Sequence, residues 1–420
     1  MKQDDNSSIV RRWVPALLLI LLGLVVAVLT LYYLRVRYDW DDILYWFWQL
    51  AVHLSHTRLA IAIASMGLAV WLTARWLSGA HVAHAALAAF GLGVLVDAII
   101  LLSLEPLRIS FGPLLLPLAL LAAVRGAVAL VLVLLAWLLH RVVRPASTWP
   151  LLHAAAQVLI AVVVVDGMVI EPARLTVSRV SVQDPYAIAS SRPLRIVQIS
   201  DLHIERVNDL TDHLVAQVNS LEPDLIVLTG DFLNSSFTTD PQAQADLVRV
   251  LGALRAKEGI YAVRGNVDAP AATARLLSGL PIVLLEGEWV NLEIGGHCVS
   301  LCGVPMDDLE QDRRVLADLV RVGPHDCFRV LLYHSPNLVP EAVAAGFDLF
   351  PTGHTHGGQI RLPFYGALMT SCIYGKRYEM GPYHVGNTLI YVSRGIGMEG
   401  WLVPRMRFLC PPEIVVYDIK

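Results

Sequence analysis

The stretch LRIVQISDLH, residues 194–203, decides the fold of the polar part of the chain, because it runs from an apolar segment directly into Asp201 and His203. Short runs rich in Ile, Val and Leu that end in polar turns predict buried β-strands. The aspartate and the histidine follow at the point where this strand is expected to end. Both are common ligands of divalent metal ions, so the stretch predicts a strand with candidate metal ligands at its carboxyl end.

Five further strand-like runs occur downstream, and amphipathic stretches lie between several of them. The strand-like runs lie at residues 224–230, 260–265, 328–334, 348–354 and 388–395. The amphipathic stretches lie at residues 210–220, 242–256 and 309–322. Strands that alternate with helices predict an α/β layered fold, in which ligands bind outside the carboxyl ends of the strands.

The polar clusters that follow five of these runs are expected to meet at one edge of the fold. Together they supply seven oxygen and nitrogen ligands: Asp201, His203, Asp231, Asn266, His334, His354 and His356. Such a set, without a thiolate, suits Mn²⁺, Zn²⁺ or Fe²⁺. One catalytic ion takes about three or four protein ligands, whereas two ions about 3.5–4 Å apart that share a carboxylate can use seven. The sequence therefore predicts a centre of two divalent metal ions.

The order of these motifs resembles that of the calcineurin-like metallophosphoesterases, which is D-x-H, G-D, G-N-H-[DE], H and G-H-x-H. The resemblance covers about residues 193–420. Segments 357–363, 393–397 and 411–414 resemble the branch of membrane-associated bacterial phosphoesterases. The resemblance implies a two-sheet sandwich flanked by helices and a hydrolase, specifically a metal-dependent phosphoesterase.

The resemblance also implies a role for each ligand. It assigns Asp201, His203 and His356 to the first ion, Asn266, His334 and His354 to the second, and Asp231 to both. Two such cations would hold a water between them, lower its pKa and direct hydroxide at the phosphorus of a phosphoester or pyrophosphate.

Three further residues join Asp231 and Asn266 as candidate catalytic residues. Asp268 occupies the acidic position of the G-N-H-[DE] motif, and Arg361 and Arg394 lie in glycine-flanked segments after motif strands. The arginines are predicted to contact the anionic phosphoryl group. The alternative for both is structural pairing with carboxylates, which are in excess in this part of the chain.

Val267 departs from the pattern because it stands where the family has a histidine. That imidazole is thought to protonate or polarise the leaving oxygen, and loss of a general acid typically costs about 10²–10⁴ in rate. Three explanations stay open: a leaving group of low pKa, as in a pyrophosphate or nucleotide, an acid supplied elsewhere, or a weakened enzyme. We favour the first. The alternative function is a metal-retaining sensor or scaffold with weak or no turnover.

Composition divides the chain into two unlike parts. Its 420 residues are 55% hydrophobic and 16% charged, whereas soluble proteins average about 45–50% and about 25%. Crossing a bilayer takes about 20 apolar residues. Five runs of roughly this length lie at residues 14–34, 59–77, 82–104, 114–139 and 151–170. The segment 41–56 predicts an amphipathic helix in the membrane interface.

We therefore expect a multi-pass transmembrane domain at residues 1–172, a linker with a short strand at 173–192 and the phosphoesterase domain at 193–420. This organisation predicts a cell-membrane protein in contact with lipids, with a phosphoester substrate that includes lipid-linked and cell-envelope compounds among the candidates. After residue 172 the chain carries 21 Lys and Arg against 27 Asp and Glu, which excludes a broad nucleic-acid surface. Basic residues flank the crossings equally on both sides, so the positive-inside rule leaves the side of the domain open.

Three charged residues, Asp97, Arg125 and Asp166, fall at membrane depth, where charges often mark a functional site. The alternative is an ion pair between Arg125 and one of the aspartates that holds the bundle together. A transporter is a third class of function, but the sequence lacks the paired broken helices typical of one.

The five cysteines all lie after residue 172. Cys298 and Cys302 belong to one strand-like stretch and stand about 13 Å apart, too far to bridge each other. The sequence thus predicts no disulfide framework.

Overall fold

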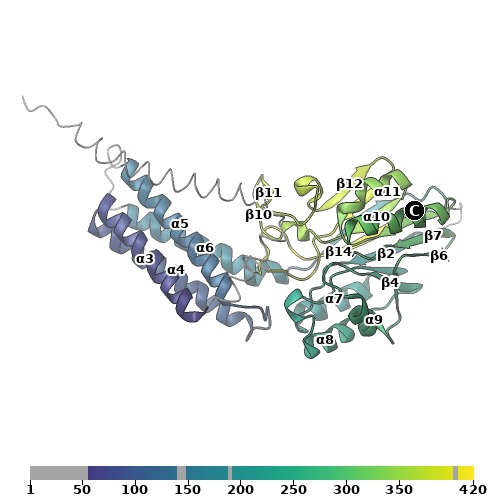
Figure 1. The fold of residues 1–420 in the computed structure, drawn as a ribbon, viewed down its shortest axis with the longest axis horizontal. Helices are drawn as coiled ribbons and strands as arrows, with labels where there is room; N and C mark the ends of the chain where they lie inside the picture. The colour runs from purple at the N-terminus through teal and green to yellow at the C-terminus, as the bar shows by residue number, and fades with distance from the viewer. Residues whose placement is uncertain (1–54, 140–147, 188–191, 401–404) are drawn as a thin grey trace, which may run out of the picture. The chain divides into compact units, whose positions relative to one another are not determined.

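The computed structural model describes residues 55–139, 148–187, 192–400 and 405–420 (Figure 1). The chain divides into two compact units, residues 1–62 and residues 63–420. In the described residues, the second unit contains most of the apolar helices and the whole α/β part. The predicted domain boundary at residue 172 stays a prediction.

Four long apolar helices come first in the described chain. They are α3 (His56–Leu77), α4 (Ala80–Leu104), α5 (Leu115–Leu139) and α6 (Trp149–Val165), which continues through a π-helical turn (Asp166–Ile170) and a 3₁₀ turn (Glu171–Ala173). All four are long and apolar enough to cross a membrane, and they match four of the five predicted crossings. The crossing predicted at residues 14–34, and the interfacial helix predicted at 41–56 up to residue 54, lie outside the described residues.

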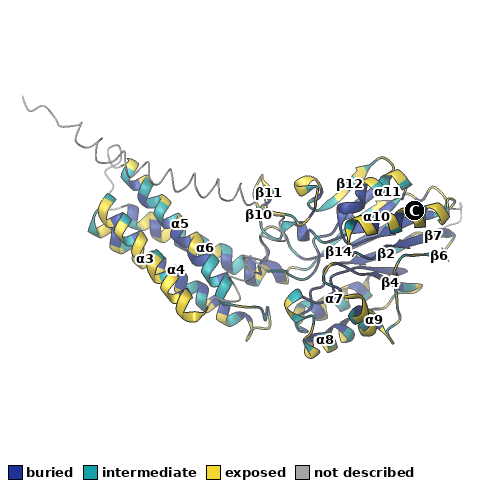
Figure 2. Ribbon diagram, viewed as in Figure 1, coloured by how far each residue is buried: buried dark blue, intermediate teal, exposed yellow. Residues whose placement is uncertain are grey.

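The outward face of α4 is apolar. Leu92, Leu95, Ile99 and Leu102 are each more than half exposed and follow one another at helical spacing (Figure 2). Apolar side chains gain free energy when they leave water. A stripe of exposed leucine and isoleucine on a helix of this length is therefore suited to contact with lipid.

Inside the bundle, Arg125 of α5 joins α4 to α6. Its guanidinium donates from Nε and Nη2 to the two carboxylate oxygens of Asp97, each at 2.6 Å. Nη1 donates to the backbone and side-chain oxygens of Gln157, at 2.8 and 2.9 Å. Arg125 and Asp97 are fully buried, so the structure forms the ion pair that the structural alternative predicts, with Asp97 rather than Asp166.

Loss of the Asp97 charge should weaken the bundle. Asp97→Asn leaves the Arg125 guanidinium buried without a counter-charge, and we expect a loss of about 3–5 kcal/mol in the free energy of unfolding. Thermal unfolding of the purified protein in detergent micelles measures the change. The double variant Asp97→Asn/Arg125→Met removes both charges and should recover most of the loss. An unchanged unfolding midpoint in the single variant would contradict a structural role for this pair.

Two six-stranded sheets form the α/β part. The first has the order β1 (Thr176–Val182), β14 (Glu413–Ile419), β2 (Leu194–Ile199), β3 (Leu225–Thr229), β4 (Gly259–Val263), β5 (Ile282–Leu284). The second has the order β12 (Gly381–Val385), β13 (Thr388–Val392), β9 (Leu349–Thr352), β8 (Phe328–Leu332), β7 (His297–Gly303), β6 (Glu288–Ile294). A separate pair joins β10 (Arg361–Leu362) to β11 (Gly366–Ala367). Strands β2 to β5 run parallel, as do β7, β8, β9 and β13, so within each set the carboxyl ends face the same edge.

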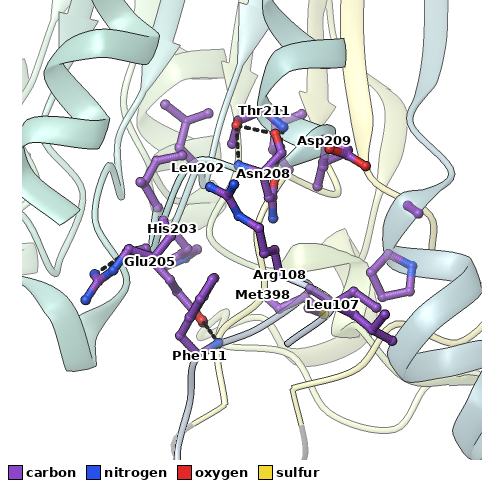
Figure 3. Close-up of a pocket in the computed structure, with 18 of the residues that line it drawn as sticks. Leu107, Arg108, Phe111, Leu202, His203, Glu205, Asn208, Asp209, Thr211 and Met398 are labelled. Carbon is purple, nitrogen blue, oxygen red and sulfur yellow. Dashed lines mark hydrogen bonds between the residues drawn. The ribbon is translucent and has the colours of Figure 1, made fainter. Parts of the chain in front are cut away.

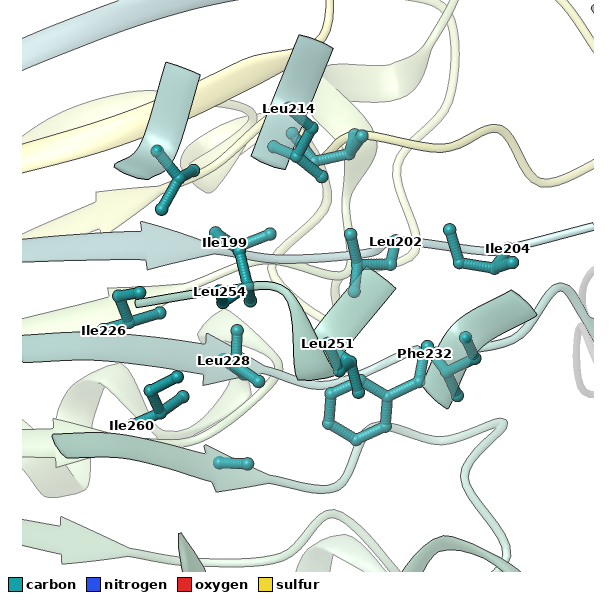
Figure 4. Packing of buried hydrophobic residues seen from close by; sticks show 14 of the residues in the cluster. Ile199, Leu202, Ile204, Leu214, Ile226, Leu228, Phe232, Leu251, Leu254 and Ile260 are labelled. Carbon is teal, nitrogen blue, oxygen red and sulfur yellow. The ribbon is translucent and has the colours of Figure 1, made fainter. Parts of the chain in front are cut away.

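Helices cover both outer faces of the two sheets. The helices α7 (Asp209–Ser220), α8 (Pro241–Gly252) and α9 (Pro270–Leu277) pack on the first sheet, and α10 (Leu309–Val322) and α11 (Val339–Ala345) on the second. Figure 4 shows Ile199, Ile226 and Leu228 of the first sheet beside Leu251 of α8. Another apolar cluster fills the space between the sheets. The predicted two-sheet sandwich flanked by helices is confirmed.

The segment predicted as a linker with a short strand contains β1. This strand pairs in parallel with β14 from Thr176↔Glu413 to Val182↔Ile419 and forms an edge of the first sheet. The last membrane helix is therefore followed directly by a strand of the sandwich. The chain closes the first sheet by placing its own last strand between β1 and β2.

The prediction of no disulfide framework is wrong for one pair of cysteines. Cys298 at the start of β7 is bonded to Cys327, directly before β8, with Cα atoms 4.8 Å apart. The two strands are parallel neighbours in which Val299 lies opposite Phe328, so their preceding residues also meet. Spacing along one strand cannot reveal this pairing, because it depends on strand register. Cys302, Cys372 and Cys410 are free and buried.

Candidate metal centre

Six predicted ligands come together at the carboxyl ends of four strands. Asp201 and His203 follow β2, Asp231 follows β3, His334 follows β8, and His354 and His356 follow β9. They fall into two groups, Asp201 with His203 and His356, and Asp231 with His334 and His354. Within each group the candidate ligand atoms all lie within 4.8 Å of one another.

The backbone turns sharply at five of these ligands. Asp201, His203, Asp231, His354 and His356 all have φ between 42° and 69°. This left-handed region is unfavourable for residues with a side chain, and such strain concentrates at functional sites. Hydrogen bonds between the loops stabilise this backbone conformation. The His203 amide donates to the Asp231 carbonyl at 3.0 Å, and the His354 amide donates to Asp201 Oδ1 at 3.0 Å.

Two glycines let the loops approach the carboxylates. A Cβ at Gly265 would collide with the Asp231 carboxylate, and one at Gly353 would collide with Asp201 and Ser200. The glycine of the G-N and G-H motifs is therefore required here by packing, because any side chain would push a ligand out of place.

The first group joins two imidazoles and a carboxylate. Nε2 of His203 and Nε2 of His356 lie 3.0 Å apart, and the latter is 3.3 Å from Asp201 Oδ1. The two imidazole rings stack with centroids 4.8 Å apart. The buried Nδ1 atoms of both histidines lack a hydrogen-bond partner among the described residues. Nδ1 of His203 does lie 3.3 Å from Glu399 Oε2, without hydrogen-bond geometry.

The second group has its tautomers set by backbone carbonyls. His334 Nδ1 lies 2.6 Å from the Thr229 carbonyl and His354 Nε2 lies 3.0 Å from the Ser371 carbonyl. Carbonyls accept hydrogen bonds, so these nitrogens carry the protons and the other ring nitrogens are free to act as ligands. Those two, His334 Nε2 and His354 Nδ1, lie 3.2 Å apart, and His334 Nε2 is 3.1 Å from Asp231 Oδ2.

These distances fit a metal centre. Ligands held at about 2.0–2.2 Å from a tetrahedral ion lie about 3.3–3.6 Å from one another. The nitrogen and oxygen contacts in both groups, at 3.0–3.3 Å, are close to that spacing. In each group, two imidazole nitrogens face each other. The second nitrogen of each ring either lacks a hydrogen-bond partner among the described residues or is bound to a backbone carbonyl. The facing nitrogens are therefore arranged as ligands of a cation. The residues present therefore fit the metal centre that the sequence predicts.

Asp231 lies between the two groups. Its Oδ2 is 3.1 Å from His334 Nε2 and 3.6 Å from His203 Nε2, which belong to different groups. Its Oδ1 accepts a hydrogen bond from the Val267 amide at 3.2 Å. One carboxylate thus faces both sets of imidazoles.

The electrostatics of the buried groups favour a cation. Burial lowers the pKa of His334, but the nearby Asp231 and Asp201 outweigh burial and raise that pKa to about 10. Burial and the positive charge of His334 lower the pKa of His354 to about 4. Burial also lowers the pKa of His356 well below its usual value. The carboxylates attract positive charge. His354 and His356, whose pKa values are lowered, are neutral at pH 7, and each therefore keeps a lone pair on one ring nitrogen.

Asp268 stabilises the loop that carries Asp231 through hydrogen bonds to backbone amides. Its buried carboxylate accepts hydrogen bonds from the backbone amides of Asp231 at 2.7 Å, Gly265 at 2.9 Å and Phe232 at 3.0 Å. Burial and the neighbouring Asp231 charge raise its pKa to about 6. With its oxygens directed at these amides, Asp268 positions Asp231. The catalytic role predicted for Asp268 stays a prediction.

The remaining predicted site residues lie around the two groups. Asn266 is exposed in the loop after β4, next to the half-buried Val267. Arg361 pairs with Glu379 at 2.9 Å, and Arg394 pairs with Glu413 at 3.0 Å. Both arginines make the carboxylate pairing that the alternative predicts. Their contact with a phosphoryl group, like the role of Asn266, stays a prediction.

Sequence reasoning missed Glu399. Its carboxylate lies beside His203 and accepts hydrogen bonds from the Ser235 hydroxyl at 2.9 Å and the Gly400 amide at 3.0 Å. Carboxylates behind metal-binding histidines commonly orient the ring through a hydrogen bond, and Glu399 lies at such a position, 3.3 Å from His203 Nδ1 but without hydrogen-bond geometry. Glu399 stands two residues after the Ser393–Gly397 segment that the sequence singles out, so its position near a motif strand was the available signal.

This sandwich, with two groups of imidazole and carboxylate ligands at its strand ends, defines a metal-dependent phosphoesterase. A family model of calcineurin-like phosphoesterases matches residues 194–358. The metallophosphoesterase YkuE of Bacillus subtilis is 36% identical over 236 residues, which cover 54% of this chain and 79% of YkuE. The chain belongs to the calcineurin-like metallophosphoesterase family and is a metal-dependent hydrolase of phosphoesters.

Two further relatives carry names that describe a reaction. The UDP-2,3-diacylglucosamine pyrophosphatase LpxG of Chlamydia trachomatis is 27% identical over 300 residues, which cover 58% of this chain and 89% of LpxG. The phosphodiesterase YaeI of Escherichia coli is 27% identical over 240 residues, which cover 55% of this chain and 83% of YaeI.

Each ligand group should account for one bound ion. We expect about two ions per chain after equilibration with Mn²⁺ and dialysis, and about one in His203→Ala or His334→Ala, because each variant removes an imidazole from one group only. Mass spectrometry of the metal content measures this. His213→Ala, an exposed histidine on α7, is the matched control. Undiminished metal in both site variants would contradict the assignment.

Proposed function

We propose that this protein is a membrane-tethered phosphohydrolase with two divalent metal ions, Mn²⁺, Zn²⁺ or Fe²⁺, that hydrolyses a phosphoester or pyrophosphate bond. The observation that carries the proposal is the position of Asp231 between two groups of imidazoles. The tether consists of four helices long enough to cross a membrane. The substrate class that we favour is a lipid-linked or cell-envelope pyrophosphate.

The proposed ligands follow the two groups, with Asn266 added from the resemblance. Asp201, His203 and His356 would hold one ion, His334, His354 and Asn266 would hold the other, and Asp231 would serve both. Divalent ions bound there supply Lewis-acid stabilisation to phosphoryl oxygens and lower the pKa of water. The protein holds the free ring nitrogens of His334 and His354 toward the centre through the Thr229 and Ser371 carbonyls, and fixes Asp231 through Asp268.

Val267 supports the choice of a pyrophosphate. Its isopropyl group has no proton to give, and its amide is engaged with Asp231, so residue 267 does not protonate a leaving oxygen. A phosphate leaving group has a much lower pKa than an alkoxide and departs without that proton. LpxG, a relative that covers 58% of this chain, is named as a pyrophosphatase of UDP-2,3-diacylglucosamine.

The identity of residue 267 should decide the preference for leaving groups. We expect the wild-type chain to hydrolyse pyrophosphate-linked and aryl substrates about 10²–10⁴ times faster than alkyl monoesters, the factor that a general acid is worth. Val267→His should raise kcat/KM on alkyl monoesters by about tenfold or more and leave the aryl rate within about threefold. Val267→Ala, which adds no donor, is the control.

Two results of this comparison would count against the proposal. Fastest wild-type turnover on alkyl monoesters would refute the preference for a low-pKa leaving group. Two bound ions per chain without hydrolysis of any phosphoester would favour the alternative, a metal-retaining sensor or scaffold.

We further propose that the phosphoesterase domain lies on the extracytoplasmic side of the cell membrane. The Cys298–Cys327 disulfide supports this side, because disulfides persist in oxidising compartments and are rare in the cytosol. The basic residues around the crossings do not decide the question.

Reporter fusions in a bacterial host test the side. Alkaline phosphatase fused after Lys420 should be active and a fluorescent protein at the same position dark. A fusion at residue 144, which α6 separates from the domain, should give the opposite pattern. A bright fluorescent fusion after Lys420 would place the domain in the cytoplasm.

A further inference from the structure

A cavity of about 360 Å³ lies next to the candidate metal centre, wholly within residues 63–420. Its volume falls in the range of about 300–1,000 Å³ that is usual for ligand sites. One of its wall residues is His203, a member of the first ligand group. An occupant of this cavity would therefore lie beside the candidate metal centre.

Another part of the lining comes from the connection between two of the apolar helices and from the end of a third. It includes Leu107, Ile109 and Phe111, from the segment between α4 and α5 (residues 105–114, called the α4–α5 segment), and Val169 from the end of the α6 helix. Leu202 and Ile396 complete a mostly apolar lining. These apolar side chains are suited to contact with a hydrocarbon chain, while Arg108, Arg206 and Asn208 of the same lining offer polar groups.

Polar contacts between the α4–α5 segment and the loop after His203 define the shape of the cavity. Glu205 accepts hydrogen bonds from the Phe111 amide at 2.6 Å and the Ser110 hydroxyl at 3.2 Å, and it pairs with Arg405. Arg108 Nη2 donates to the Val207 carbonyl at 2.7 Å. Figure 3 shows Phe111 beside Glu205 and Arg108 extended across the cavity. The same loop that carries His203 is thus fastened to the α4–α5 segment.

We propose that this cavity binds an acyl chain of a membrane lipid whose phosphoester or pyrophosphate headgroup reaches the metal centre. The inference rests on the proposed function and narrows its substrate class to acylated compounds drawn from the bilayer. The membrane helices contribute one wall of the substrate site and are therefore more than an anchor.

Two wall substitutions test the proposal in the full-length chain in detergent. Ala173→Trp fills the cavity from an exposed wall position and Leu107→Asp places a charge in its apolar wall. We expect either variant to lower kcat/KM for a diacylglycerol pyrophosphate in mixed micelles by tenfold or more, mainly through KM. Hydrolysis of the soluble substrate bis(p-nitrophenyl) phosphate should stay within twofold. Val322→Trp, an exposed site on α10, is the matched control.

The outcomes separate this proposal from the proposed function. Equal loss on both substrates would overturn the acyl-chain site, because the wall would then merely support the metal centre. Unchanged kinetics on both would overturn it as well, and leave the phosphohydrolase assignment intact.

A binding measurement needs no turnover. Phosphatidic acid with a photoreactive diazirine in one acyl chain should label peptides that contain residues 105–114 or 202–211, and Ala173→Trp should reduce this labelling about tenfold. Labelling confined to the outer faces of the helices, or equal in the variant, would refute the site even if the enzyme proved inactive.

Discussion

The buried carboxylate of Asp231 is the group on which the rest of the site depends. Burying a carboxylate costs several kcal/mol unless positive charge and hydrogen bonds compensate it. Here the compensation comes from the Val267 amide on one oxygen and from imidazoles of both ligand groups near the other. The ring nitrogens of these imidazoles also lie 3.0–3.2 Å from imidazole nitrogens of their own group, and a divalent cation could accept several of their lone pairs at once. The folded backbone therefore holds a buried carboxylate and several imidazoles together in the two groups that are candidate metal ligands.

The sandwich supplies the rigidity that this arrangement needs. Five of the ligands occupy left-handed backbone, a conformation that costs about 1–3 kcal/mol each in this setting. On flexible loops, residues would leave this left-handed conformation. At the ends of buried parallel strands, hydrogen bonds between loops stabilise it instead. The His203 amide donates to the Asp231 carbonyl, and the Asp268 carboxylate accepts hydrogen bonds from three backbone amides. Strain at the ligands is thus offset by contacts between loops that are far apart in the sequence.

Candidate ligands at strand ends could be predicted from the sequence, because they depend on residue type. Contacts that depend on strand register or on backbone atoms could not be predicted from it. Asp201, His203, Asp231, His334, His354 and His356 could be predicted because each follows an apolar run. The carbonyls of Thr229 and Ser371, which set the histidine tautomers, leave no mark in the sequence. Cys298 and Cys327 bond only because β7 and β8 pair in one register. Arg361 and Arg394 were predicted to contact phosphate because of their glycine neighbours; the fold adds their pairs with Glu379 and Glu413, which the sequence left as the alternative, and the phosphate contact stays a prediction.

The loop from Leu202 to Val207 links the two parts of this chain through a few bonds. His203 stands at one end of the loop among the ligands, while Glu205 and Val207, two and four residues on, accept hydrogen bonds from the α4–α5 segment. A displacement of that segment would therefore be transmitted to a ligand over a distance of two residues. The buried Asp97–Arg125 pair joins the same two helices that the segment connects, so their relative position is fixed by a contact that tolerates little sliding. The helix bundle therefore constrains the loop of His203, because the Asp97–Arg125 pair joins the two helices and hydrogen bonds join the segment between them to that loop.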